Sequence, residues 1–264
     1  MHKILVIGEV CIDHFYYGNC KRLCPEAPVP VFLPNGEFKV TEGMAGNVKN
    51  NLISLSKSKI QVKSLRQAEL IVKSRYVDKS SGYLLLRVDN DPSCSPLKFD
   101  FNIAEYNAVV ISDYDKGFLS REVLKKILQK AARLQIPTFM DTKKILSPEW
   151  SSDAFVVKIN KREFESHDQI GLDCYKNLVV TSGKDGSCLL NDSGNFHSQA
   201  KEVAVREVSG AGDTYLAAYV IEYLNLVGTL GQLDALTKAM DFANKAAGVA
   251  VSKPGVVEVS WEEI

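Results

Sequence analysis

The sequence lacks a charge excess of either sign, because 32 Lys and Arg residues balance 32 Asp and Glu residues in a chain of 264. A balanced chain generates no overall field that would favour nucleic acid or a membrane surface. Phosphate binding would have to be local, so the expected ligand is a small molecule. Long apolar runs are lacking too, since no stretch approaches the roughly 18 uninterrupted apolar residues of a membrane span.

Secretion signals and paired cysteines are also missing. The apolar run after Met1-His2-Lys3 is too short for a signal peptide and continues into polar residues. The six cysteines show no CxxC spacing and only four histidines are present, which argues against a structural zinc site. Cys20 and Cys24 could pair, but free thiols are favoured in a chain without an export signal. We expect a soluble cytoplasmic protein.

What the sequence does contain is an alternation of short apolar runs and helical patterns. This alternation indicates βα units and a largely parallel sheet, hence the α/β class, in one principal domain. Strands are predicted at Lys3–Ile7, Ala108–Ile111, Thr138–Met140, Ala154–Ile159, Leu178–Thr181 and Ser187–Leu190. Helices are predicted at Asn47–Leu55, Arg121–Leu134, the stretch after Asp213, and Leu233–Val251.

Two stretches break the βα rhythm. Glu26–Phe32 is interrupted by prolines and should be extended, while Leu70–Val77 and Tyr83–Val88 flank a plausible hairpin turn at Lys79-Ser80-Ser81-Gly82. Together they could build a small β-layer that closes over a cleft as a lid, or the hairpin could be an ordinary sheet edge.

Gly210-Ala211-Gly212-Asp213-Thr214 precedes a run of helix-compatible residues. Such a helix start leaves backbone N–H groups free at the positive end of the helix dipole, which suits an anion such as a transferring phosphoryl group. Asp213 could be a plain helix cap, or it could accept a proton from an attacking hydroxyl. The GxxxxGK[ST] motif of a P-loop is absent, and Gly8-Glu9-Val10 lacks the glycines of a dinucleotide fingerprint.

Two further groups of residues have both a structural and a functional interpretation. Asp13 follows the first strand, and Gly43-Met44-Ala45-Gly46-Asn47 precedes a helix. One interpretation is that each is a plain turn residue. Alternatively, the Asp13 carboxylate and the Asn47 amide bind sugar hydroxyls. Asn160 and Glu163 follow a strand with the spacing of a helix capping box. The same two side chains could instead hold Mg²⁺ through its waters.

In this order along the chain, the motifs resemble those of the ribokinase-like (PfkB) carbohydrate kinases. The series runs through Gly8 and Asp13, Gly43-x-Ala-Gly-Asn47, Asn160-x-x-Glu163, Thr181-x-Gly183-x-x-Gly186, Gly210-Ala-Gly-Asp213 and Asn244-x-x-Ala-Gly248. The resemblance implies a three-layer α/β/α sandwich with a mostly parallel central sheet and a small β-lid, with lid elements at about 14–40 and 70–90. It also implies ATP as phosphoryl donor, Mg²⁺ and a small sugar or sugar phosphate as acceptor.

The resemblance implies a role for each motif residue. Gly210, Ala211 and Gly212 would form an anion hole and Asp213 would be the catalytic base. Asp13, Gly43 and Asn47 would hold the sugar, while Thr181, Gly183, Gly186 and Asn244 would border the nucleotide. Asn160 and Glu163 would organise Mg²⁺ and phosphates. Arg75, Lys116 and Lys143 would meet a substrate phosphate, or else they are solvated surface charges.

Within the family, the chain is most similar to the D-glycero-β-D-manno-heptose-7-phosphate 1-kinases of lipopolysaccharide precursor synthesis. The similarity rests on Arg22-Leu-Cys-Pro-Glu-Ala-Pro-Val-Pro-Val31, Ser112-Asp-Tyr-Asp-Lys-Gly117 and Asp141-Thr-Lys143. Another sugar or a nucleoside as acceptor, or nucleotide binding without turnover, are the alternatives. Retention of Asp213 with Asn160-x-x-Glu163 argues against a pure binder.

The chain departs from the family pattern in three places. Met44 replaces a small residue next to the expected sugar site, and Thr142 replaces a proline. The segment 56–72 is shortened, which should uncover a sheet edge and favour a compensating homodimer, such as one through the β-lid, or lower the stability. We expect no nucleotidyltransferase domain, because the sequence ends at Ile264, where the kinase domain ends.

Overall fold

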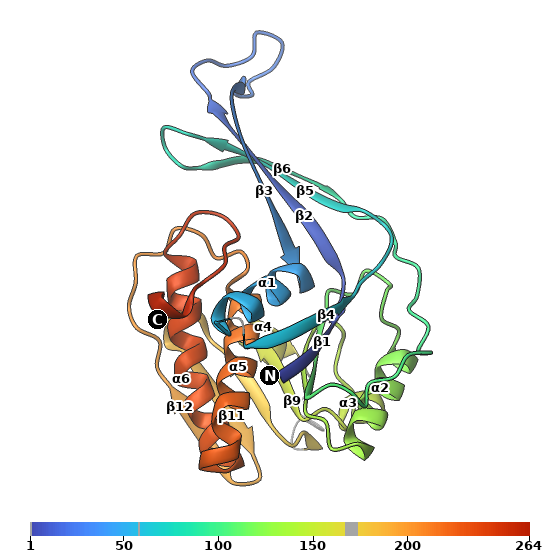
Figure 1. Ribbon diagram of the computed structural model, residues 1–264. Helices are drawn as coiled ribbons and strands as arrows, with labels where there is room; N and C mark the ends of the chain where they lie inside the picture. Colours follow the sequence, from blue (N-terminus) through green and yellow to red (C-terminus); the bar gives the residue numbers. More distant parts are fainter. Residues whose placement is uncertain (1, 58, 167–173) are drawn as a thin grey trace.

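The computed structural model describes residues 2–57, 59–166 and 174–264. Its elements form two sheets with helices around the larger one (Figure 1). The strands are β1 (His2–Gly8), β2 (Val10–Asn19), β3 (Leu33–Met44), β4 (Ile60–Leu65), β5 (Ile71–Asp78), β6 (Leu84–Asn90), β7 (Ala108–Asp113), β8 (Thr138–Thr142), β9 (Val156–Asn160), β10 (Leu178–Thr181), β11 (Ser187–Asn191) and β12 (Gly194–Ser198). The helices are α1 (Ala45–Leu55), α2 (Arg121–Arg133), α3 (Pro148–Ser151), α4 (Lys161–Ser166), α5 (Ala211–Leu230) and α6 (Gln232–Val251).

The larger sheet has eight strands in the order β12-β11-β10-β9-β8-β7-β1-β4. Neighbouring strands from β10 to β4 run parallel to each other. At the opposite end of the sheet, β11 and β12 are antiparallel to their neighbours. All six strands predicted from apolar runs are present in this sheet. The prediction succeeds because parallel strands are buried on both faces and therefore appear as nearly continuous apolar segments.

Helices cover both faces of the large sheet, and β1 shows how the two cores are divided. Ile4 and Val6 belong to the core under α1, α5 and α6. Leu5 and Ile7, which alternate with them, belong to the core under α2 and α3. Because side chains alternate along a strand, a continuous apolar run fills both cores. Figure 1 shows α5 and α6 on one side of the sheet and α2 and α3 on the other, which gives the three predicted layers.

The smaller sheet projects from one end of the larger one and has the order β3-β2-β5-β6 (Figure 1). The predicted hairpin is present as β5 and β6. Gly82 in its turn has φ +75°, a conformation that favours glycine, and the Asp78 carboxylate accepts the Ser81 N–H at 2.9 Å. The other two strands of this sheet are β2 and β3, which were not predicted from the sequence.

Two details of the predicted β-layer need correction. Glu26–Phe32 is not a strand of the small sheet; it lies in the connection between β2 and β3 and contributes one isolated bridge, Leu23 to Pro30. Its prolines lack the N–H groups that a ladder needs. In addition, β4 lies within the segment 56–72, where no strand was predicted. It pairs with β1, and its outer edge has no strand partner in the described parts of the chain.

Candidate functional site

The run Gly210–Thr214 starts α5 with a tight turn. Gly210 has φ +81°, in the left-handed region, and is the residue before the helix. The N–H of Ala211 bonds to the Val208 carbonyl and that of Thr214 to the Gly210 carbonyl. Within the described ranges, the N–H groups of Gly212 and Asp213 have no such partner. The helix therefore begins with free donors at its positive end, as an anion site requires.

Asp213 is enclosed by side chains from two distant segments. The residue is 4% exposed. Tyr114 donates its hydroxyl to Asp213 Oδ1 at 2.8 Å, and Asn47 Nδ2 donates to Asp213 Oδ2 at 3.3 Å. Burial, together with the nearby Asp141, raises the pKa of Asp213 to about 6, although the two donors and the Lys158 ammonium oppose this. A carboxylate with such a pKa can accept a proton near neutral pH.

The alternative interpretation of Asp213 as a helix cap does not fit this geometry. The cap position is occupied by Gly210, which has no side chain to supply a hydrogen bond. Asp213 is the third residue of the helix, and its carboxylate contacts Tyr114 and Asn47. The Asp213 carboxylate therefore does not cap the helix, and its contacts with Tyr114 and Asn47 hold it in the site.

A cavity of about 200 Å³ opens in front of Asp213, and we call it the Asp213 cavity. It brings together five of the predicted site residues: Asp13, Gly43, Arg75, Gly210 and Asp213. Its lining is Cys11, Asp13, Gly43, Met44, Lys73, Arg75, Arg87, Tyr114, Ser209, Gly210, Asp213 and Val256. The polar lining contains both donors and acceptors, as a polyol ligand needs.

Asp13 and Gly43 depend on each other in the wall of this cavity. Asp13 is 2% exposed and forms a buried ion pair with Arg75. A Cβ added to Gly43 would lie 2.1 Å from Asp13 Oδ2, so only glycine leaves space for the carboxylate. Met44, the residue that departs from the family pattern, has φ 58° and packs its side chain into the core. A positive φ in a non-glycine residue stores strain next to the cavity.

A second cavity, of about 390 Å³, lies on the other side of the α5 start, and we call it the Asn244 cavity. Its lining includes the predicted nucleotide residues Thr181, Gly183, Gly186 and Asn244, together with Ala211 and Gly212. Val203, Val205, Val208, Ala247 and Val251 supply apolar surface. An apolar slot with a few polar groups suits an aromatic base.

Asn244 itself has a structural role in this wall. Its Nδ2 donates to the Ser198 carbonyl at 3.0 Å and to Ser198 Oγ at 2.8 Å, and its Oδ1 accepts from Ser187 Oγ at 3.3 Å. These bonds fix α6 to the antiparallel edge of the large sheet. Asn244 therefore shapes the cavity that it lines.

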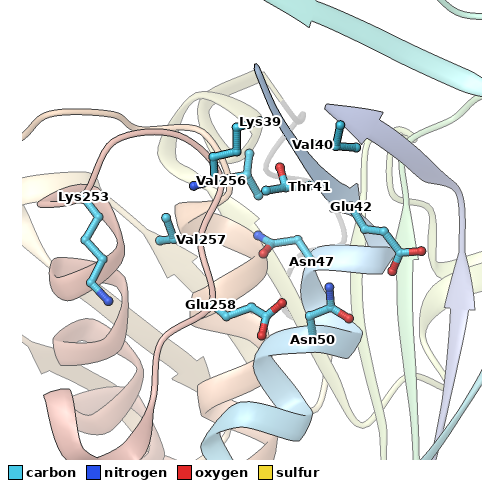
Figure 2. A pocket seen from close by; sticks show the side chains of 10 residues that line it. All are labelled: Lys39, Val40, Thr41, Glu42, Asn47, Asn50, Lys253, Val256, Val257 and Glu258. Carbon is cyan, nitrogen blue, oxygen red and sulfur yellow. The ribbon is translucent and has the colours of Figure 1, made fainter. Parts of the chain in front are cut away.

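A third cavity, of about 450 Å³, adjoins the site through Asn47. Figure 2 shows Asn47 and Asn50 of α1 facing residues 256–258, with Lys39 and Thr41 of β3 above them. Because Asn47 also donates to Asp213 and to the Gly210 carbonyl, it separates this cavity from the catalytic candidate.

Asn160 and Glu163 form the capping box that was one of their two interpretations. Glu163 donates its N–H to Asn160 Oδ1 at 2.9 Å, and Asn160 donates its N–H to Glu163 Oε2 at 2.8 Å. The other Glu163 oxygen accepts from Lys143 Nζ at 2.5 Å. Burial lowers the pKa of Lys143, but Asp141 and Glu163 more than offset this and raise it above its usual value.

The geometry also leaves room for a metal role. Asp141 Oδ1 is buried and makes no hydrogen bond in the described part of the chain, and it lies 3.9 Å from Lys143 Nζ. A buried carboxylate oxygen without a hydrogen bond fits Mg²⁺, which binds few protein ligands and keeps several waters. No group of three or more His, Cys, Asp or Glu residues forms a ready metal cage among the residues described.

Lys116 is not brought to these cavities. Its ammonium pairs with Asp91 Oδ2 at 2.6 Å, and Lys116 lines none of the three cavities. The loop that carries it is nevertheless part of the site, because Glu9 accepts the N–H groups of Tyr114, Lys116 and Phe118. This buried carboxylate fixes the position of Tyr114.

Four residues of the site were not predicted from the sequence: Tyr114, Lys158, Lys73 and Arg87. Lys158 is buried and pairs with Asp141 Oδ2 at 2.5 Å, and its Nζ would lie 3.0 Å from a Cβ added to Gly212. The spacing Lys158-x-Asn160 at the end of a strand could have indicated it. Lys73 alternates with Arg75, and Arg87 with Asp89, on predicted strands of the hairpin. Tyr114 lies in the segment Ser112–Gly117 that carries the similarity to heptose-7-phosphate kinases, but no role was assigned to it from the sequence.

The fold and site define a carbohydrate kinase of the PfkB family, and the chain belongs to that family. Residues 89–263 match the family described as pfkB family carbohydrate kinase. Among individual proteins, the chain is 32% identical over 311 residues to the bifunctional protein HldE of Nitratiruptor sp. and 30% identical over 312 residues to that of Sulfurimonas denitrificans. Each alignment covers 99% of this chain, and the chain spans 64% and 63% of those relatives, less than two thirds of their length.

Solved structures extend the likeness to the whole fold. Ribokinase from Thermotoga maritima has a TM-score of 0.69 at 15% identity, over 100% of this chain and 98% of that one. Phosphofructokinase-2 from Escherichia coli, in complex with potassium, has a TM-score of 0.69 at 17% identity, over 100% and 97% of the two chains. At these identities the likeness concerns the fold alone, and it confirms the predicted ribokinase-like architecture.

A membrane helix is not found in the described ranges, since none of their helices is both long and apolar enough to cross a bilayer.

Proposed function

We propose that the protein transfers a phosphoryl group from ATP to a hydroxyl of a sugar phosphate, with D-glycero-β-D-manno-heptose 7-phosphate phosphorylated at O1 as the first choice. One observation supports this proposal above the others. The segment Gly210–Asp213 separates two cavities: Gly210 and Asp213 line one, and Ala211 and Gly212 line the other. Direct phosphoryl transfer requires two things: a base that faces the acceptor, and an anion hole that faces the nucleotide.

In this mechanism each group has one task. Asp213 accepts the proton of the attacking hydroxyl in the Asp213 cavity. The free N–H groups at the α5 start and the Lys158 ammonium stabilise charge on the transferring phosphoryl group. Tyr114 and Asn47 hold the Asp213 carboxylate in place. Asp141, with Glu163 and Asn160 through water, would hold Mg²⁺, which supplies positive charge beside the phosphates.

The choice of acceptor rests on sequence. The segments Arg22–Val31, Ser112–Gly117 and Asp141–Lys143 are similar to those of heptose-7-phosphate kinases, and the relatives named HldE align over 99% of the chain. Other acceptors are the second candidate, because Met44, which lines the Asp213 cavity, replaces the small residue of the family pattern.

An ADP-release assay over a panel of acceptors tests the proposal. The panel contains heptose 7-phosphate, hexose phosphates, neutral sugars and nucleosides, each with Mg·ATP. We expect the highest kcat/KM with the heptose phosphate. If another acceptor gives a higher kcat/KM, that acceptor replaces heptose 7-phosphate as the proposed substrate. Nucleotide binding without any turnover would overturn the kinase assignment.

The pH dependence should report the Asp213 carboxylate. With a pKa of about 6, kcat/KM should rise about tenfold per pH unit below pH 6 and level off above it, because the charged form is the base. Tyr114→Phe removes a donor that lowers this pKa, so the midpoint should move upward. Tyr16→Phe is the control, because the Tyr16 hydroxyl forms its hydrogen bond with His14 among the described residues. An unchanged midpoint in Tyr114→Phe would argue against Asp213 as the titrating base.

We further propose that the small sheet is a lid and pairs with a second copy of the chain. Its outer face carries Tyr16 stacked on Tyr76 at 5.0 Å and beside Phe38 at 4.9 Å. Phe38, Leu86 and Val88 are about half exposed, at 49%, 56% and 50%. An apolar face of this kind favours association. Light scattering at micromolar concentration should give the mass of a dimer; a monomer mass would refute the pairing.

A further inference from the structure

The inner face of the small sheet carries a row of charged side chains that faces the Asp213 cavity. Alternate residues of each strand share a face. The strand register places Lys73 between Asp13 on β2 and Asp89 on β6, and it places Arg75 opposite Arg87. Lys73, Arg75 and Arg87 all line the Asp213 cavity. Three cations from two neighbouring strands thus line the same small space as the proposed base.

Two of these three cations already have a carboxylate partner. Arg75 forms its ion pair with the buried Asp13. Arg87 binds Asp89 through two hydrogen bonds, each 2.7 Å long. A paired guanidinium keeps further donors that can bind another anion, but its charge is largely balanced.

Lys73 is different. The residue is only 9% exposed, and in the parts of the chain that are described its ammonium has no hydrogen bond and no carboxylate within ion-pair distance. The ammonium lies over the Tyr114 ring, 5.6 Å from the ring centroid. A buried ammonium without a direct ion-pair contact is costly, even with the carboxylates of Asp13 and Asp89 on the neighbouring strands. The cost is offset when a ligand brings the missing anion.

The contact with Tyr114 relates this ammonium to the reaction centre. The hydroxyl of the same tyrosine donates to Asp213, so Lys73 and Asp213 lie at the ring face and the hydroxyl end of one side chain. An acceptor molecule in the cavity can therefore present a hydroxyl to Asp213 while an anionic group at its far end meets Lys73.

We propose that Lys73, assisted by the free donors of Arg75 and Arg87, is the subsite for an anionic group of the acceptor, and that Lys73 makes the enzyme prefer a phosphorylated sugar over its neutral counterpart. This inference rests on the proposed kinase function, and it assigns the choice to Lys73 instead of Lys116 or Lys143. Lys116 is paired with Asp91, and Lys143 is paired with Glu163. A phosphate group suits three neighbouring cationic donors because its several oxygens each accept charge-assisted bonds.

The first test compares Lys73→Met with Lys73→Arg and with Lys63→Met, an exposed lysine of β4. For the sugar phosphate, Lys73→Met should raise KM about ten- to hundredfold, as expected for the loss of a charged hydrogen bond. The KM for ATP and for the dephosphorylated sugar should change less than about twofold, because these contacts do not involve the anionic group. Lys73→Arg should retain the preference, and Lys63→Met should behave as wild type.

Equal KM changes for the phosphorylated and the neutral sugar, or no change for either, would overturn the subsite. A sugar acid included in the panel distinguishes a phosphate from a carboxylate: a Lys73-dependent preference for the sugar acid over the sugar phosphate would contradict the phosphate assignment. Thermal unfolding of each variant shows whether it is folded, and Lys73→Gln, which also removes the positive charge, carries the test if Lys73→Met does not fold.

A second measurement separates this inference from the kinase proposal. Inorganic phosphate is titrated into the wild type and the Lys73 variants by calorimetry, without nucleotide. Suppose that Lys73→Met binds phosphate about tenfold or more weakly than wild type, and that the protein shows no turnover. This result would support the subsite and refute the kinase proposal. If the protein turns over but binds inorganic phosphate equally well in wild type and Lys73→Met, the kinase proposal is supported and the subsite is refuted.

Discussion

Replacing Asp213 by asparagine is expected to lower kcat by about 10²- to 10⁴-fold, the usual contribution of a general base. Asparagine has the same size and can still accept the Tyr114 hydroxyl, but it cannot take a proton at neutral pH. The KM for ATP should change little, because Asp213 lines the Asp213 cavity and not the Asn244 cavity. ADP release and nucleotide titration measure the two quantities.

Stability provides an internal check on this variant. Asp213 has a folded-state pKa above its ordinary value, so the folded protein keeps this proton between about pH 4 and 6 while the unfolded chain loses it. The free energy of unfolding therefore falls as the pH rises through this window, and the charged carboxylate remains a cost above it. Asp213→Asn should remove that cost and be at least as stable as wild type at pH 8.

Asp234→Asn is the matched control, since Asp234 is an exposed residue in the first turn of α6. It should leave kcat and KM unchanged and lower the free energy of unfolding by less than about 1 kcal/mol, since its charge lies near the start of the helix. If Asp213→Asn retained more than about a tenth of the wild-type kcat, far above the range for loss of a general base, Asp213 would not be the base.

Replacing Asp13 by alanine is expected to lower the free energy of unfolding by about 3–5 kcal/mol, the usual consequence of breaking a buried ion pair. Arg75 would lose its carboxylate while Lys73 and Arg87 remain beside it in the cavity. Repulsion among three cations adds to the cost of the unpaired guanidinium. Urea unfolding measures the loss, and amide hydrogen exchange should locate it in β2 and β5, which Asp13 and Arg75 join.

Glu105→Gln serves as the comparison for this effect. Glu105 pairs with Lys3 at 3.2 Å on the surface, and both side chains are about half exposed. Exposed pairs contribute less than about 1 kcal/mol. An Asp13→Ala variant that lost no more stability than Glu105→Gln would mean that the Asp13–Arg75 pair does not hold the small sheet together.

The strands and helices were predictable to different degrees, and the reason is burial. β1 and β7 are covered on both faces, so their sequences are nearly continuous apolar runs. β2 and β3 were missed because the small sheet is half solvated, and polar and charged residues interrupt their patterns. β4 alternates half-buried and exposed residues over only six positions, which is too short a signal at a sheet edge.

The candidate site was predictable where its residues belong to one short segment. The Gly210–Asp213 run predicted the helix start and the anion hole from local geometry alone. The spacing of Asn160 and Glu163 left a capping box and a Mg²⁺ role open; the structure contains the capping box, and the role toward Mg²⁺ is still a proposal. For Arg75, Lys116 and Lys143 the sequence offered three equivalent basic residues, and only their partners distinguish them.

The sequence by itself determined six of the eight strands of the large sheet, where the glycine turn before α5 lies, and that the chain follows the order of a carbohydrate kinase. The tertiary structure alone decided what surrounds Asp213: Tyr114 lies 99 residues before it and Asn47 lies 166 residues before it. It also decided that Lys73 lacks a carboxylate partner in the described chain while its neighbours have one. The physical reason is that a turn or a buried strand is encoded by adjacent residues, whereas the charge balance of a cavity depends on which distant side chains the fold brings together.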